Sequence, residues 1–317
     1  MVRASGLRRR PKIGFVSGWR KGNGGGIAAG RLALTPSPDG CSLHLDPDRA
    51  RTTPRRKHVI VSRKSSHHQI FVTQERGTRY LRFGDGPTQG AVQPADPVAM
   101  VLPYTRYLPV GLGFGTARSL LMIGLGAGSL PRLLRAGFSD MRIDVVEIDP
   151  DVVEIAKEYF FVREDPLYRI RVSDGRAFVK RVKTRYDMVV LDAFCSGSIP
   201  YHLTTLEFYL EVKSALTEGG ILVSNMVQWT AGGLYRMMLR TLREAFGPIL
   251  LFPVQGRANV VVVGRADGTI LPKAQLSEAL LRLQPRMHPS VDLKEVAEAC
   301  SGPPAGLDDV PVLRDRE

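Results

Sequence analysis

Residues 120–129, with the sequence LLMIGLGAGS, contain the stretch that decides the fold. Its four leading apolar residues predict a strand that is buried on both faces. The glycines at alternate positions, Gly124, Gly126 and Gly128, predict a tight turn into a helix, where a ligand can approach the backbone at the helix N-terminus. Residue 129 is a serine and not the third glycine of the dinucleotide fingerprint, so the loop favours a mononucleoside over a nicotinamide dinucleotide.

The chain around this loop alternates buried strands with amphipathic helices. Strands are predicted at residues 120–123, 143–148, 170–172, 187–191 and 221–224, and helices at 129–136, 150–159, 175–182, 204–216 and 233–246. Such a series predicts a parallel sheet with right-handed crossovers. Residues 249–253 and 259–263 flank a Gln-Gly-Arg turn and predict a hairpin at the sheet edge. We therefore expect an α/β fold with a Rossmann-like, doubly wound, mostly parallel sheet and an antiparallel edge hairpin.

A small β-stranded domain is predicted before this sheet. Short runs of β-forming residues at 68–73, 78–83 and 88–92 are separated by glycine turns, which is typical of an antiparallel meander. A helical stretch at 97–108 follows. The expected domains are a tail at 1–57, the β-rich domain at 58–110, a Rossmann-like nucleoside-binding catalytic domain at 111–284 and a Pro-rich, weakly structured segment at 285–317.

The net charge of +13 is concentrated at the start of the chain. Residues 1–57 contain 13 lysines and arginines against three acids, so the remaining residues carry only about +3. The tail is rich in Gly, Pro, Ser and Arg without a regular period, and we interpret it as disordered. A solvated tail is favoured over a tether to nucleic acid or a membrane surface, and the body shows no strong preference for a polyanion.

Cysteine use and hydropathy indicate the compartment. The three cysteines, Cys41, Cys195 and Cys300, are far apart and predict neither a disulfide framework nor a CxxC metal site. His67-His68 lacks a third ligand, so no metal is expected. No apolar run reaches the roughly 18 residues of a membrane span. We expect a cytoplasmic protein.

Acidic residues stand at the ends of the next two strands. Glu147 follows Gly124 by 23 positions, where a carboxylate can accept both hydroxyls of a ribose. Asp149 precedes a proline and is interpreted as a helix N-cap. Asp174, followed by Gly175, can accept the exocyclic amine of adenine or cap the next helix. Three loops of adjacent strands thus converge on one nucleoside.

The fourth strand ends at Asp192, where the catalytic loop of an open α/β sheet begins. If the mononucleoside is one such as S-adenosylmethionine, the carbon next to its sulfonium can be attacked by an amine. An amine is protonated at neutral pH and must lose a proton before it attacks. A partly buried carboxylate can accept that proton or orient the amine. Tyr201 and His202 are expected to line the acceptor pocket, with His202 as an auxiliary base. Thr204 and Glu207 predict a capping box.

These motifs, in this order, resemble the spermidine synthase family of polyamine aminopropyltransferases over residues 58–265. Residues 65–69 (SSHHQ) are similar to the family's entry motif ending in Tyr-Gln, and residues 84–89 (GDGPTQ) to its Leu-Asp-Gly-x-x-Gln. The resemblance implies a homodimer formed through the β-stranded region and a co-substrate that is S-adenosylmethionine or its decarboxylated form. It also implies that Gln69 contacts the nucleoside, Glu147 the ribose and Asp174 the adenine, and that Asp192 is the first aspartate of a catalytic Asp-x-x-Asp.

Three departures from the family pattern affect the reacting groups. Ala127 replaces the aspartate of Gly-Gly-Gly-Asp-Gly, Cys195 replaces the second catalytic aspartate, and a Tyr-His-Glu motif is absent from 97–104. An aspartate at about 4 Å from the carboxylate of S-adenosylmethionine would cost about 1 to 4 kcal/mol, and Ala127 removes this repulsion.

The sequence therefore predicts a transferase that alkylates a small amine acceptor, with methyl transfer slightly preferred. Polyamine aminopropyl transfer is the first alternative, and a catalytically silent nucleoside-binding scaffold is the second. A nicotinamide-dependent oxidoreductase is disfavoured by Ser129.

Overall fold

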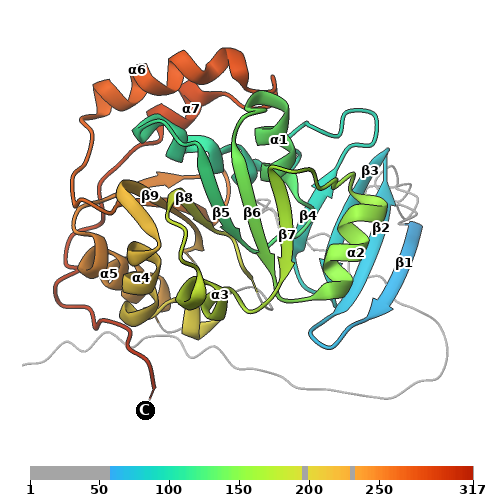
Figure 1. The fold of residues 1–317 in the computed structure, drawn as a ribbon, viewed down its shortest axis with the longest axis horizontal. Helices are drawn as coiled ribbons and strands as arrows, with labels where there is room; N and C mark the ends of the chain where they lie inside the picture. Colours follow the sequence, from blue (N-terminus) through green and yellow to red (C-terminus); the bar gives the residue numbers. More distant parts are fainter. Residues whose placement is uncertain (1–57, 195–198, 229–232, 317) are drawn as a thin grey trace, which may run out of the picture. The chain divides into compact units, whose positions relative to one another are not determined.

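The computed structural model describes residues 58–194, 199–228 and 233–316. The predicted tail, Cys41 and Cys195 lie outside these residues. The described chain forms two β-sheets with helices packed on them (Figure 1). Among the helices of this part of the chain, none is long and apolar enough to cross a membrane.

The smaller sheet is antiparallel, with its strands in chain order: β1 (His58–Lys64), β2 (Gln69–Glu75), β3 (Thr78–Phe83) and β4 (Thr88–Val92). The sequence predicts the last three, and β1 extends the sheet by one further strand. One face of the sheet buries Ile70, Val72 and Leu81 against the helix α2 (Pro150–Tyr159), so this face of the small sheet contributes to the same packed body as the larger sheet.

The larger sheet has seven strands in the order β10-β11-β9-β8-β5-β6-β7. The run from β9 through β8, β5 and β6 to β7 can be followed in Figure 1. Their bounds are β5 (Ser119–Ile123), β6 (Arg142–Glu147), β7 (Tyr168–Val172), β8 (Tyr186–Leu191), β9 (Leu216–Val227), β10 (Ile249–Pro253) and β11 (Asn259–Arg265). Strands β5 to β9 pair in parallel, whereas β11 pairs antiparallel with both β9 and β10. The predicted fold class, with its edge hairpin, is confirmed.

Helices cover both faces of this sheet because its strands are apolar on both faces. Leu120 and Met122 of β5 face a core shared with α1 (Ser129–Gly137) and α6 (Lys273–Leu283). Leu121 and Ile123 face the opposite core, which contains α3 (Gly175–Arg181), α4 (Leu206–Ser214) and α5 (Leu234–Phe246). The remaining α-helix of the described residues is α7 (Leu293–Glu298). This arrangement is that of a doubly wound sheet.

Two predicted segments differ from the structure. The stretch predicted to be helical at 97–108 forms only the short 3-10 helix η2 (Pro103–Arg106), and a second one, η3 (Leu108–Phe114), begins at its end, because prolines and glycines interrupt the α-helical pattern. The chain after residue 285, for which little structure is expected, contains α7 and buries Leu293, Val296 and Leu313.

The helix caps agree with the sequence at one helix and differ at another. Asp149 caps α2, as predicted, and its carboxylate accepts from the backbone N–H of Asp151. The capping box predicted at Thr204 is displaced by one residue, because Thr205 is the N-cap of α4 and accepts from Phe208. Thr204 instead donates to the carbonyl of Tyr201, and Glu207 binds the C-terminal segment of the chain.

The order of strands reverses at β5, which has β8 on one side and β6 on the other. Ligands of open α/β sheets bind in the crevice beyond the carboxyl ends of the strands at such a point.

Candidate functional site

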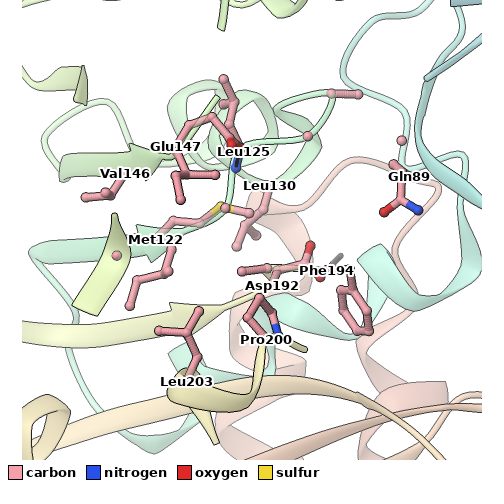
Figure 2. Close-up of a pocket in the computed structure, with 18 of the residues that line it drawn as sticks. Gln89, Met122, Leu125, Leu130, Val146, Glu147, Asp192, Phe194, Pro200 and Leu203 are labelled. Atoms are coloured by element: carbon pink, nitrogen blue, oxygen red, sulfur yellow. Dashed lines mark hydrogen bonds between the residues drawn. The ribbon is translucent and has the colours of Figure 1, made fainter. Parts of the chain in front are cut away.

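A cavity with about 1160 Å³ of free space, its open mouth included, lies at this crevice (Figure 2). The predicted site residues that line it are Gly124, Gly126, Glu147, Asp174, Gly175, Asp192 and His202. Residues from the ends of β5, β6, β7 and β8 thus share one cavity, at the place where open α/β sheets bind their ligands.

The glycine loop, residues 124–128, lines this cavity through residues 124–127. Gly124 has a φ of +95°, and a Cβ at this position would lie 2.4 Å from the carbonyl oxygen of Asp192. Gly126 has a φ of +51° and also lines the cavity. Gly128 is not among the residues that line the cavity. It packs against the core instead, where a Cβ would lie 2.4 Å from the side chain of Val162. The prediction that Gly128 binds a ligand is therefore replaced by a packing role.

Glu147, at the end of β6, is held by the backbone of two neighbouring loops. Its carboxylate accepts from the N–H of Leu125 at 2.9 Å and from the N–H of Asp149 at 3.1 Å. Burial raises the pKa of Glu147, and these hydrogen bonds oppose the rise. The side chain is fixed at the cavity wall beside the glycine loop (Figure 2).

Asp174 combines the two roles that the sequence leaves open. One carboxylate oxygen caps α3 by accepting from the N–H of Ala177 at 2.8 Å, and the other lies 3.1 Å from Nε2 of His202. Gly175 follows it, and a Cβ there would lie 2.4 Å from Ile123. His202 therefore stands at the edge of the cavity in contact with an acid rather than beside Asp192.

Asp192 lies deep in the cavity at the end of β8. Its carboxylate accepts a hydrogen bond of 2.9 Å from Nδ2 of Asn225 and one of 3.4 Å from the hydroxyl of Tyr104. Burial raises the pKa of Asp192 to about 6, although both hydrogen bonds lower it. A carboxylate with this pKa can accept a proton near neutral pH.

Two predicted site residues lie outside the cavity. Gln69, at the start of β2, is exposed and donates to the hydroxyl of Ser62 on the neighbouring strand β1. Tyr201 points to the outer surface, where its hydroxyl donates to the carbonyl of Arg314. Alternation along β2 and the docking of the C-terminal segment explain these two errors.

The structure adds cavity residues that the sequence did not single out. His68 stacks on Phe83, with ring centroids 4.0 Å apart, and both rings line the cavity together with Gln89, Tyr104 and Phe194. Gln89 ends the quoted motif at residues 84–89, so that motif was the available signal for it. No pattern in the sequence marks Tyr104 as the partner of Asp192, because the two are 88 positions apart.

Comparisons with known proteins place this chain in a family. The model of the spermine/spermidine synthase domain matches residues 110–271. A polyamine aminopropyltransferase of Vibrio vulnificus is 33% identical over 226 residues, which cover 68% of this chain and 74% of that protein. An eEF1A lysine and N-terminal methyltransferase of Bos taurus is 28% identical over 158 residues, which cover 46% of this chain and 22% of that protein.

A solved structure shows the same fold. Spermidine synthase from Thermotoga maritima superposes with a TM-score of 0.63 at 20% identity and covers 80% of this chain and 87% of that one. The chain belongs to the spermine/spermidine synthase family and is a transferase that uses a sulfonium donor of the S-adenosylmethionine type.

Proposed function

We propose that the protein transfers an aminopropyl group from decarboxylated S-adenosylmethionine to the amine of a small acceptor. The observation that carries this proposal is the position of Asp192, whose pKa is about 6, in the same cavity as Glu147 and Asp174. A carboxylate with this pKa is mostly ionised at neutral pH and still basic enough to accept the proton of an ammonium group.

The residues of the cavity fit an adenosyl sulfonium. Gly124 and Gly126 line the cavity with bare backbone, and the carboxylates of Glu147 and Asp174 provide acceptors for ribose hydroxyls and an adenine amine. His68 and Phe83 add a stacked aromatic wall. The bound donor supplies an activated carbon, because its sulfonium sulfur can leave as a neutral thioether.

Asp192 has the central part in the proposed reaction. It orients the acceptor ammonium and takes one proton from it, so that the nitrogen lone pair becomes free. The nitrogen–carbon bond then forms as the carbon–sulfur bond breaks, and the electron pair of that bond neutralises the sulfur as a thioether. Asn225 and Tyr104 hold the Asp192 carboxylate in place through this step. The cavity contributes by alignment of the reacting atoms.

Charge supports the aminopropyl group over the methyl group. The described residues that line the cavity include Glu147, Asp174 and Asp192 but no lysine or arginine. A decarboxylated donor carries only positive charge and suits this lining, whereas the carboxylate of S-adenosylmethionine has no cationic side chain to pair with there. The Vibrio relative is named for the same activity.

The expected preference for methyl transfer loses part of its support in the structure. Ala127 is buried, and its Cβ and backbone N are so close to Gly90 that a Cβ on Gly90 would lie 2.4 Å and 2.8 Å from them. A small residue at 127 therefore has a packing reason that is independent of donor charge. Methyl transfer stays the second candidate, because the absent aspartate still removes repulsion of a donor carboxylate and one relative is a methyltransferase.

Product masses test this proposal. The full chain is incubated with either decarboxylated S-adenosylmethionine or S-adenosylmethionine, together with putrescine or propylamine, and the products are analysed by mass spectrometry. We expect the parent protein to form the aminopropyl product and Asp192→Asn to form none. Calorimetry should show that Asp192→Asn still binds 5′-methylthioadenosine. Methyl addition alone would replace the proposal with the second candidate, and nucleoside binding without any product would support a silent scaffold.

A further inference from the structure

The last described residues of the chain cross the segment that carries His202. The carbonyl of Leu313 accepts from the N–H of Leu206 at 2.8 Å, and the N–H of Asp315 donates to Glu207 at 2.9 Å. The hydroxyl of Tyr201 donates to the carbonyl of Arg314 at 2.9 Å. The C-terminal segment, residues 313–316, is therefore bonded to both ends of the stretch from Tyr201 to Glu207.

Arg176 connects this C-terminal segment to the cavity. Arg176 is buried, with 8% of the residue exposed, and its guanidinium forms ion pairs with Asp315 at 2.6 Å and with Glu211 at 2.7 Å. It also donates to the backbone carbonyl of His202 at 3.2 Å. Asp315 accepts in addition from the hydroxyl of Thr205 at 2.8 Å, and these partners lower the pKa of Asp315 to about 2.

Arg176 is connected to both residues of the contact between His202 and Asp174. It lies in the first turn of α3, two residues after Asp174, and its guanidinium binds the backbone carbonyl of His202. The ring of His202 lies 3.1 Å from the carboxylate of Asp174. Charge-assisted bonds of this kind hold their partners in a defined geometry.

We infer that Arg176 and Asp315 are positioning residues: the C-terminal segment holds the 3-10 helix η4 (Tyr201–Leu203) so that His202 stays on Asp174 at the edge of the donor site. This inference rests on the proposed function, because it takes the cavity as the site of the adenosyl donor. Loss of the Asp315 carboxylate frees η4, removes His202 from the cavity edge and leaves Asp192 unchanged.

Asp315→Ala in the full chain tests this inference. Asp308→Ala is the matched control, because Asp308 of the same C-terminal region also pairs with a helix arginine, Arg243, which lies in α5 and not next to Asp174 in α3. Binding of 5′-methylthioadenosine is measured by calorimetry, and KM for the donor and kcat are measured with the most active amine. For Asp315→Ala we expect about tenfold weaker nucleoside binding and a similarly raised KM, with kcat within about twofold of the parent.

A second variant separates positioning from folding. Asp315→Glu keeps the charge on a side chain that is one methylene longer and is expected to recover nucleoside affinity to within about threefold of the parent. Hydrogen exchange of the amides of Leu203 and Thr204 is expected to accelerate in Asp315→Ala and not in Asp308→Ala. Unchanged affinity and exchange in Asp315→Ala would overturn the inference, as would equal losses in both alanine variants. A parent protein that binds no nucleoside would instead overturn the proposed function.

Discussion

The side-chain amide of Asn225 donates a hydrogen bond of 2.9 Å to the carboxylate of Asp192, and its own oxygen accepts one of 3.1 Å from Asn259. Strands β9 and β11, which carry the two asparagines, are neighbours in the sheet. The amide of Asn259 thus fixes which way the amide of Asn225 points. The edge hairpin thereby contributes indirectly to the orientation of the candidate base.

The hydrogen bond from Asn225 to Asp192 predicts how catalysis depends on pH. Replacement of Asn225 by leucine removes a hydrogen bond that lowers the pKa of Asp192, so that pKa rises above its value of about 6. We expect the acidic limb of the kcat profile to move to higher pH by about one unit. Asn259→Ala, which only loosens the orientation of Asn225, should move it less. An unshifted acidic limb in Asn225→Leu would show that Asp192 is not the group that titrates.

Asp192 also predicts how stability changes with pH. Its pKa is raised by burial from 3.8 to about 6 in the folded protein, so ionisation disfavours the folded state. The contribution of the protonated group is fully present below pH 4 and is lost as the pH rises through about 6. As the pH rises from 4 to above 6, we expect the free energy of unfolding of Asp192→Asn to fall less than that of the parent. Thermal melts from pH 4 to pH 8 measure this, and parallel curves for the two proteins would contradict it.

A third prediction concerns the contact of the small sheet with the glycine loop. A methyl group on Gly90 of β4 would meet the Cβ and backbone N of Ala127 at 2.4 Å and 2.8 Å, and a backbone atom cannot turn aside. Gly90→Ala should displace the loop, weaken 5′-methylthioadenosine binding at least about tenfold and destabilise the fold by about 1 to 3 kcal/mol. Gly115→Ala is the control, because its position is open and its backbone extended. Calorimetry and denaturation of both variants decide the matter, and equal affinities would argue against the contact.

The sheet and most of the cavity were predictable because their signals are local. An apolar strand followed by a glycine turn or an acid is read from a few adjacent residues, and parallel strands carry these ends to one edge. Gly124, Glu147, Asp174 and Asp192 were found in this way. The resemblance to a known family then added the expected chemistry.

Contacts between distant parts of the chain could not be predicted in this way. The hydrogen bond from Tyr104 to Asp192 and the docking of Asp315 on Arg176 depend on tertiary packing that no local period encodes. Gln69 was misplaced because a short motif does not determine the face of the strand toward which a side chain points. Tyr201 was misplaced because its partner lies 113 positions further along the chain.

The surroundings of Asp192 predict which amines are accepted. Phe194, Pro200 and Leu203 line the cavity around it, as Figure 2 shows. The stretches 195–198 and 229–232, outside the described residues, contain no acidic residue either. A monoamine places its ammonium on Asp192 and its chain on this apolar wall, whereas the second ammonium of a diamine finds no anion beside that wall.

Phe194→Asp should therefore change the choice of acceptor. A second carboxylate two residues after Asp192 gives the far ammonium of a diamine a partner, and it costs a monoamine its apolar contact. We expect the ratio of kcat/KM for putrescine to that for propylamine to rise about tenfold or more. Phe194→Asn is the control, because asparagine has the size of aspartate but no charge. It should leave the ratio near that of the parent, since a neutral amide pairs only weakly with an ammonium group. If the asparagine variant shifts the ratio as far as the aspartate variant, loss of the ring rather than gain of an anion determines the acceptor.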